Sequence, residues 1–397
     1  MGQFMDVDYN VSEFLRFRDF DESSRNLVDA MDKFTHLLDA KVHIDSSDSK
    51  YLHIYQGIET VVKRVLEELI KLDPYFAKVK LRRTGSSMSG VKVGFPHETD
   101  YLLELPKDDK LKTGKSFKDG TLILVVRQIV KEQATSLTQG LGHWIIHGQV
   151  EHSKTGGVCL VMECSSSADG SASEVVGVTV DLVPVYIMET TSEELKEKAE
   201  VYLSNTLEGY AQRGELYKLL NSSLSDTGFI ENMMMKQLPE DKKRAFRVVK
   251  FLIATASVKP LIPFSCIQSL DQETLLRLYG RKPCIPSFDL RILLLHLLLH
   301  IHGTAAEPKL KDGLLVLCLL DMLQQCVDYT KTIYMIFDHP IINERGDHFC
   351  NTEYSKKAID SIISRLEREN PGDVAEEFKL LNDTSKVYSD KNDDLFW

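Results

Sequence analysis

The segment that decides the fold is TGSSMSGVKVGFPHETDYLLEL, which spans Thr84 to Leu105. Its second half predicts a strand over 98–105, with Glu98 and Asp100 two positions apart on one face and leucines on the other. Two carboxylates on one face repel each other unless a cation lies between them. Magnesium prefers such oxygen ligands and completes its shell with water and substrate phosphate. The segment therefore predicts a divalent-metal site on a strand.

A small-residue loop, Gly85-Ser86-Ser87, precedes this strand and follows a basic strand predicted over Val79–Arg83. Small side chains allow the loop backbone to approach a ligand closely. We therefore expect its N–H groups and the Ser86 hydroxyl to cradle the β- and γ-phosphates of a nucleotide. A Gly-Ser pair alone is a weak signal, as is an acid-x-acid pair on a strand, whereas the two together with a third acid are much more specific.

That third acid is Asp181, in the strand-like segment GVTVDLVPVY. It is the only acid in this apolar run, and an ionised carboxylate is costly there without a partner. A neighbouring strand that aligns Asp181 with Glu98 and Asp100 would supply the partner. Three carboxylates around two metal ions suit in-line phosphoryl transfer, in which the attacking hydroxyl is activated and the leaving pyrophosphate is neutralised.

Outward from this segment, an α+β half precedes a helical half. A long amphipathic helix is predicted over Tyr51–Leu72, and helical periodicity dominates again after Thr190. Between them we expect strands at 122–126, 159–164 and 175–185, a helix at 129–141, and a polar hairpin tip at 165–173. The expected domains are an N-terminal helical extension (1–48), a core with a long helix (49–215) and an all-helical lobe (216–397).

Composition restricts the class of protein. Of the 397 residues, 43% are hydrophobic and 27% charged, which is typical of a globular chain rather than a disordered one. The net charge of −11 argues against a general nucleic-acid binder, so nucleic-acid contacts would need local basic patches. Seven scattered cysteines favour reduced thiols in a cytoplasmic or nuclear protein. We expect no signal peptide and no membrane segment, because no sufficiently long apolar run occurs.

In order and spacing, eight residues resemble the catalytic segment of cyclic GMP-AMP synthase and its animal relatives, the cGAS-like receptors: Thr84, Gly85, Ser86, Val91, Lys92, Pro96, Glu98 and Asp100. The pattern around Asp181 is similar to that of the family's third catalytic acid. The resemblance extends over about residues 50–345. It implies a nucleotidyltransferase core, with a mixed twisted sheet, flanking helices and a long spine helix, joined to a helical lobe. It also implies that Glu98 and Asp100 bind both metals while Asp181 completes the site.

Active members of this family join two nucleoside triphosphates into a cyclic dinucleotide after they bind double-stranded DNA or RNA, and the product activates STING. The resemblance therefore implies two Mg²⁺ ions, with Mn²⁺ as a substitute, and ATP or GTP as substrates. It further implies that Gly85, Ser86, Ser87 and Lys250 contact the triphosphate. Ser287 would bind a phosphate and Phe288 would stack on a base, although a helix N-cap and a core aromatic are the alternative roles of these two residues.

The chain departs from the family at two places. Vertebrate cyclic GMP-AMP synthase carries a His/Cys zinc module before its lysine helix, but residues 216–250 contain neither His nor Cys. We therefore expect no zinc, and double-stranded RNA becomes at least as good a candidate ligand as DNA. The family's W-R-x-S-F-S segment is matched only by LNSSLS at 220–225, which leaves the bases and the linkage of the product open.

Seven basic residues along the long helix and the next strand are candidate contacts to duplex phosphates: Lys63, Arg64, Lys71, Lys78, Lys80, Arg82 and Arg83. A solvated helix face is the alternative, because acidic residues are interleaved with them. A second candidate patch comprises Lys242, Lys243, Arg244 and Arg247. A ligand-induced dimer is also left open.

Two other classes of function remain. The first is an enzyme that makes linear oligonucleotides, of the oligoadenylate synthase type. The second is a family member without catalysis that binds nucleotides or nucleic acid. The presence of all three acids and of the Gly-Ser loop favours an enzyme over this second class.

Overall fold

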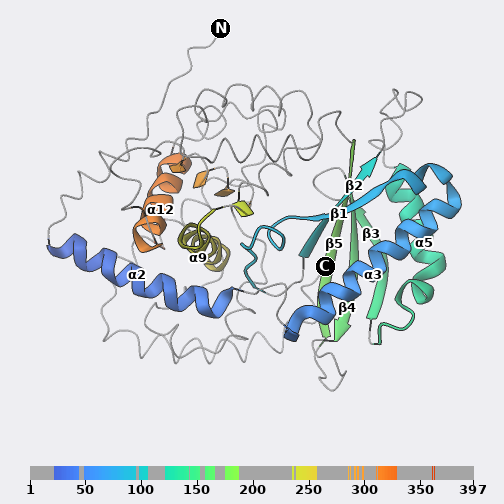
Figure 1. Cartoon of the computed structure of the whole chain (residues 1–397), viewed down its shortest axis with the longest axis horizontal. Helices are drawn as coiled ribbons and strands as arrows, with labels where there is room; N and C mark the ends of the chain where they lie inside the picture. The colour runs from blue at the N-terminus through green and yellow to red at the C-terminus, as the bar shows by residue number, and fades with distance from the viewer. Residues whose placement is uncertain are drawn as a thin grey trace, which may run out of the picture. The chain divides into compact units, whose positions relative to one another are not determined.

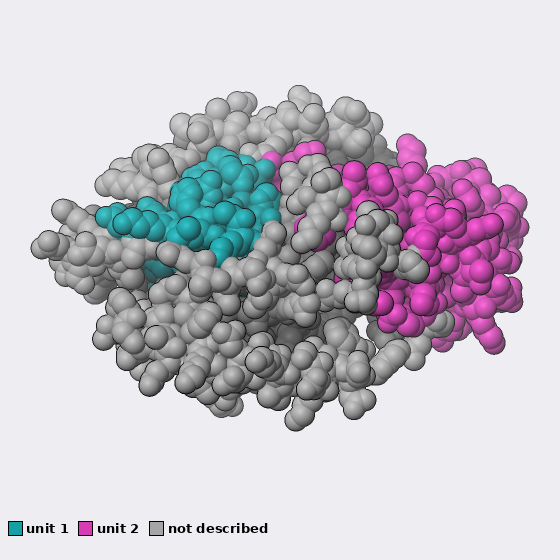
Figure 2. Space-filling view, turned by 90° about the horizontal axis from the view of Figure 1, so that it is seen from below, with its two compact units in different colours: residues 1–43, 238–397 teal, residues 44–237 magenta. Residues whose placement is uncertain are grey.

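The computed structural model describes residues 22–43, 49–94, 98–105, 121–142, 144–152, 157–165, 175–186, 235–236, 238–256, 285, 287, 290–291, 293–294, 297–298, 310, 312–328, 360 and 362. The chain divides into two compact units, one formed by residues 1–43 and 238–397 and the other by residues 44–237 (Figure 2). The sheet lies in the second of these units and a helical core lies in the first (Figure 1).

The centre of the unit 44–237 is a five-stranded mixed sheet with the strand order β1-β2-β5-β4-β3. Its strands are β1 (Lys80–Thr84), β2 (Glu98–Leu105), β3 (Trp144–His152), β4 (Val158–Ser165) and β5 (Val175–Tyr186). Only β2 and β5 pair in parallel, whereas the other neighbours in the sheet are antiparallel. The expected α+β fold with a mixed sheet is confirmed, as are the strands predicted at β1, β2, β4 and β5. The predicted hairpin tip at 165–173 lies almost wholly outside the described residues.

Two helices, α3 (Ser49–Leu72) and α5 (Thr121–Thr138), pack against each other and against the sheet (Figure 1). The apolar stripe of α3 is buried, as its periodicity predicted. Gly57 leaves room for Trp144 of β3, since a Cβ at this position would overlap the indole ring. Arg64 fastens α3 to the end of α5, because its Nη1 donates to the carbonyls of Leu137 and Gln139 at 2.9 and 2.8 Å. A short 3-10 helix, η1 (Pro74–Lys78), then leads into β1.

The strand predicted at 122–126 is wrong, because these residues begin helix α5. Its buried positions Leu122, Ile123, Val126, Ile129 and Val130 follow a helical spacing of three and four. A short apolar run with β-branched residues satisfies strand and helix patterns equally, and the packing of α5 on β3 and α3 decides between them. Strand β3 was not predicted, since an irregularity in its pairing with β4 between Ile146 and Val150 interrupts its alternation.

In the other unit, three helices pack around one apolar core: α2 (Glu22–Val42), α9 (Glu240–Ala256) and α12 (Asp312–Asp328). Each of the three contacts the other two. The start of α12 lies close to α2, and the Gly313 amide donates to Asp32 Oδ1 at 2.6 Å. The N-terminal helix α2 therefore shares a core with the C-terminal helices α9 and α12. The domain boundaries expected from the sequence stay a prediction. In the described part of the chain, no helix has both the length and the apolarity that crossing a bilayer requires.

Candidate functional site

The sheet brings two of the predicted acids together. Asp100 on β2 and Asp181 on β5 are direct Cα partners, and neighbouring strands lie about 4.8 Å apart. Partners in register project to the same face, so both carboxylates emerge side by side. Glu98 lies two residues earlier on the same face of β2 and is exposed, whereas Asp100 and Asp181 are half-buried. All three acids therefore lie on one face of the sheet.

Alternation along β2 turns these acids away from the helices. Thr99, Tyr101 and Leu103 are buried between the acidic positions. Tyr101 lies near α3, since the charges of Arg83 and of Glu59 on that helix both act on its phenol. Burial raises the pKa of Tyr101 to about 12, which keeps its hydroxyl protonated at neutral pH. The helices thus support one face of the strand, and the acids occupy the opposite one.

The Gly85 loop meets Asp100 at the end of β1. Thr84 is the Cα partner of Asp100, and the next residue, Gly85, has a φ of 78°. A Cβ on Gly85 would overlap Oδ2 of Asp100. Only glycine permits this conformation together with such a close approach of backbone and carboxylate.

The loop then closes into a single tight turn. The Gly85 carbonyl accepts from the amides of Met88 and Ser89 at 3.1 and 3.3 Å, and the Ser86 carbonyl accepts from Val91 at 3.1 Å. Ser89 Oγ also donates to the Gly85 carbonyl at 3.2 Å. This pattern resembles the first turn of a helix, where the leading N–H groups have no partner within the turn and suit an anion.

If Asp100 is a metal ligand, replacing Gly85 by Ala should displace its carboxylate and reduce a metal-dependent activity roughly tenfold or more, because the ligand is moved away from its place. The matched control is Gly140→Ala, where φ is 77° and a Cβ would meet nothing within 4 Å. Both variants carry the strain of a left-handed alanine, about 1–2 kcal/mol, but only Gly85→Ala adds the overlap. The melting temperature and the metal-dependent activity of the two variants are then measured and compared. Equal effects of both variants would contradict the close contact with Asp100.

A divalent cation fits the chemistry of this face. The possible ligands are carboxylate oxygens, which Mg²⁺ and Mn²⁺ prefer, and the glycine at position 85 leaves backbone space beside Asp100 that a side chain would fill. The three acids are spaced more widely than a closed ligand cage, since their oxygens do not form a group within 4.8 Å. Rotation about χ1 and χ2 changes this spacing, while the strand register holds the backbone of Asp100 and Asp181 fixed.

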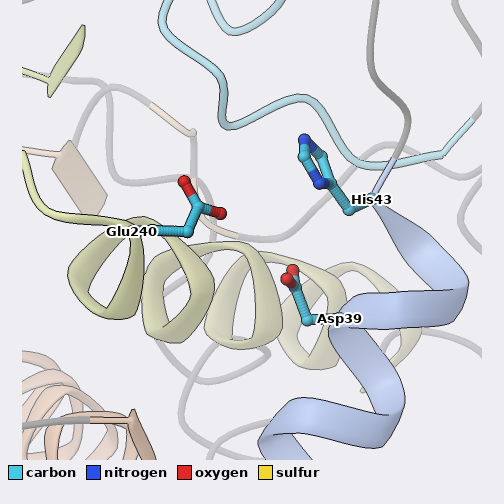
Figure 3. Close-up of side chains that lie close together, drawn as sticks. All are labelled: Asp39, His43 and Glu240. Carbon is cyan, nitrogen blue, oxygen red and sulfur yellow. The ribbon is translucent and has the colours of Figure 1, made fainter. Parts of the chain in front are cut away.

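Within the described ranges, a closer group of metal-ligating side chains lies elsewhere. Asp39 on α2, His43 just after it and Glu240 on α9 have ligand atoms within 4.8 Å of one another (Figure 3). Arg247 already neutralises this group. Its Nε donates to Asp39 at 2.5 Å, and its Nη2 donates to Asp39 at 2.6 Å and to Glu240 at 2.5 Å. The guanidinium makes this group an ion-pair network, in which a metal would have to displace a buried charge.

The predicted nucleotide contacts outside the sheet fall in the unit 1–43/238–397. Lys250 lies on α9 and is 5% exposed, and Ser287 is helical and half-buried. Phe288 and the LNSSLS segment lie outside the described residues. The roles implied for Lys250, Ser287 and Phe288 stay predictions.

Most of the candidate duplex contacts already bind within the protein. Lys63 pairs with Glu59 at 2.5 Å and Lys71 with Glu68 at 2.6 Å, both on the surface of α3. Arg82 pairs with Glu104 at 2.5 Å, and the Arg83 guanidinium lies 4.1 Å from the centre of the Tyr55 ring. Arg64 also donates to a carbonyl of α5. These internal contacts favour structural roles for Arg64, Arg82 and Arg83. Lys78 and Lys80 are exposed and form no ion pair in the described part of the chain.

Two of the four cations in the second predicted basic patch, Lys242 and Arg247, do not lie on the surface. Arg247 is fully buried and Lys242 is 9% exposed. The Lys242 ammonium donates to the Leu310 carbonyl, and Arg244 pairs with Asp312 at 2.7 Å. The sequence shows a basic run, but helix α9 directs Lys242, Arg244 and Arg247 to acids and carbonyls of the same helical unit.

If the chain binds a duplex through the segment after α3, the Lys78→Met/Lys80→Met variant should weaken binding about 3- to 10-fold at low salt. It should also reduce the salt dependence of the binding constant by the amount expected for the loss of about two phosphate contacts. The melting temperature should not change. Lys131→Met, which removes an exposed lysine of α5, is the control. Fluorescence anisotropy at several salt concentrations measures both quantities. An unchanged salt slope would remove these two lysines from the interface.

Sequence reasoning noted Lys92 in the motif but gave it no role. Lys92 is 4% exposed, and its Nζ donates to the Glu98 carbonyl at 2.9 Å. Its signal in the sequence is a lysine between two valines, at positions that are all buried. A cation in such an apolar setting needs a specific partner, and the acids six and eight positions later could have suggested one.

Comparisons with known proteins return no family for this chain. No protein-family model matches it. No curated protein matches it significantly. A functional assignment therefore depends on the residues of the acidic sheet face.

Proposed function

We propose that this chain is a metal-dependent nucleotidyltransferase of the cGAS-like type, which makes a cyclic dinucleotide from two nucleoside triphosphates. The observation that carries the proposal is the register of β2 and β5, in which Asp100 and Asp181 are direct partners beside the Gly85 turn. Strand residues E-x-D with a third acid on the neighbouring strand provide oxygen ligands on one rigid surface.

Each element of this face has a role in the proposal. Glu98, Asp100 and Asp181 hold two Mg²⁺ ions, which when bound supply a polarised hydroxyl and neutralise the leaving pyrophosphate. Asp181 also orients the attacking ribose hydroxyl. The leading amides of the turn at Gly85, together with the Ser86 hydroxyl, bind the β- and γ-phosphates. The rigid sheet fixes these groups relative to one another, which promotes in-line transfer by positioning.

The proposed trigger is double-stranded RNA or DNA, and the proposed product signals to STING. The lack of His and Cys between residues 216 and 250 supports RNA at least as well as DNA, since a zinc-based clamp cannot be built there. Of the candidate duplex contacts, Lys78 and Lys80 are exposed and form no ion pair with another described residue, which supports a role for them in meeting a duplex backbone.

The deciding experiment incubates the purified full chain with Mg²⁺ and labelled ATP, GTP, CTP and UTP. Parallel reactions contain no duplex, double-stranded DNA or double-stranded RNA, and all products are treated with phosphatase. We expect a phosphatase-resistant dinucleotide in one duplex reaction and none from an Asp100→Asn variant. A ladder of phosphatase-sensitive products would indicate a linear oligonucleotide synthase. The absence of product with Mg²⁺ and Mn²⁺, together with no nucleotide binding, would refute the proposal.

A further inference from the structure

The chain passes between its two units at two places, which lie close together on the helical unit. The unit boundaries fall between residues 43 and 44 and between residues 237 and 238. His43 is the last residue before the first connection, and Glu240 begins α9 just after the second. The polar atoms of these two side chains lie within 4.8 Å of each other and of Asp39 (Figure 3). Both connections therefore leave the helical unit at one point.

One buried cation binds the chain beside both connections. Arg247 is fully buried, and its Nε and Nη2 donate to the two carboxylate oxygens of Asp39 at 2.5 and 2.6 Å. Asp39 lies one turn before the end of α2, next to the first connection. Nη2 of Arg247 also donates to Glu240, the first residue of α9, at 2.5 Å. Asp39, Arg247 and Glu240 thus form a clasp at the point where the two connections meet.

The two halves of this clasp differ in strength. Asp39 is buried and accepts a bidentate pair, which is the stronger and more directional kind of charge-assisted hydrogen bond. Arg244 adds a second cation 3.7 Å from Asp39 and pairs with Asp312 at the start of α12, so this half is anchored to all three helices. The Glu240 side chain is 56% exposed and accepts a single bond from Arg247. Solvent screens such an exposed pair, so the Glu240 half opens more easily.

We propose that this clasp is the hinge between the two units. Two connections that leave a unit at one point permit rotation about that point, and hinges are commonly a few residues at the ends of helices or strands. While Arg247 binds both Asp39 and Glu240, the two connections are held in one arrangement. When the Glu240 half opens, the start of α9 is released and the orientation of the units becomes variable, whereas α2 stays bound through Asp39. This property goes beyond the proposed function, because it does not depend on the reaction that the sheet face performs.

The test measures a distance between the two units in the full chain. Spin labels are attached to azide-bearing residues that replace Lys33 on α2 and Lys131 on α5, both of which are exposed. Labels of this kind leave the seven native cysteines unmodified. Double electron–electron resonance then gives the distribution of the 33–131 distance. A second pair at positions 63 and 131, on α3 and α5 of the sheet unit, reports whether that unit remains intact.

Glu240→Ala removes the weaker half of the clasp and leaves the buried pair of Arg247 with Asp39. We expect the population of 33–131 distances outside the wild-type peak to rise about two- to fivefold, since a partly exposed ion pair no longer favours one arrangement. The 63–131 distances should not change. Amide hydrogen exchange in α2 should also equal that of wild type, because Asp39 still holds this helix.

Asp241→Ala is the matched control. Asp241 is the next acid in the first turn of α9, but its carboxylate pairs with Lys242 at 3.3 Å and not with Arg247. Its removal takes the same charge from the helix N-terminus and should leave the 33–131 distribution as in wild type. A wild-type distribution in Glu240→Ala, or equal broadening in both variants, would overturn the proposal. If Glu240→Ala does not fold, the same two outcomes are decided with Glu240→Gln, which keeps the length of the side chain but removes its charge.

Discussion

Replacing Asp100 by Asn should reduce the proposed nucleotidyl transfer by at least about 100-fold, a loss typical when one group that stabilises transition-state charge is removed. Asp181→Asn should have an effect of the same order, since Asp181 is the Cα partner of Asp100 on the parallel strand. Neither change should unfold the protein. Each removes one of several like charges on a half-exposed face, which relieves repulsion in the metal-free state. Initial rates at saturating Mg²⁺, with melting temperatures alongside, measure both effects.

Glu104→Gln is the matched control for these variants. Glu104 lies on the same strand and face as Asp100, four positions on, and pairs with Arg82 at 2.5 Å. Its loss should change the rate by less than about twofold and stability by about 1 kcal/mol or less, since the pair is partly exposed. A similar loss of activity in Glu104→Gln and Asp100→Asn would mean that the face responds to any change of charge. The specific role of Asp100 would then be wrong.

Replacing Arg247 by Met should destabilise the helical unit by about 3–5 kcal/mol, the usual cost of breaking a buried ion pair by removal of one partner. Arg247 is fully buried and binds two acids, Asp39 on α2 and Glu240 on α9. Burial lowers the pKa of Arg247, but both acids raise it, and the net direction is upward, so the guanidinium stays charged. Its removal leaves the buried Asp39 carboxylate without its bidentate partner.

Amide hydrogen exchange followed by mass spectrometry is the suitable measurement, because two units need not unfold in one step. Faster exchange is expected in α2 and α9, with the sheet unchanged. The control is Lys63→Met, which removes an exposed pair with Glu59 and should cost about 0.5 kcal/mol or less. A second change, Asp39→Leu, should recover much of the loss in Arg247→Met, since no buried charge then remains unpaired. Exchange in Arg247→Met equal to that of wild type would show that the ion pairs contribute nothing to holding α2.

Local periodicity was enough to predict a helix or strand wherever that element buries a single face. The 3–4 spacing in α3 and the alternation in β2 predicted both elements and the buried side of each. Five apolar residues at 122–126 satisfied two periods at once, so the sequence could not distinguish a strand from the first turns of α5. The irregular pairing of β3 hid a real strand for a related reason, since it interrupts the period that identifies one.

The types of residue on the candidate face were therefore determined by the sequence: two acids at strand spacing, a lone acid in an apolar strand and a glycine before them. Only the tertiary structure decided that Asp181 pairs with Asp100 rather than with another strand, because strand order depends on contacts between distant segments. The tertiary structure also decided which partners the basic residues bind. Arg64 caps a helix, Arg247 meets Asp39 across 208 positions, and Lys92 reaches the Glu98 carbonyl. A basic residue in a sequence indicates a charge, but its partner is set by what the fold places within reach.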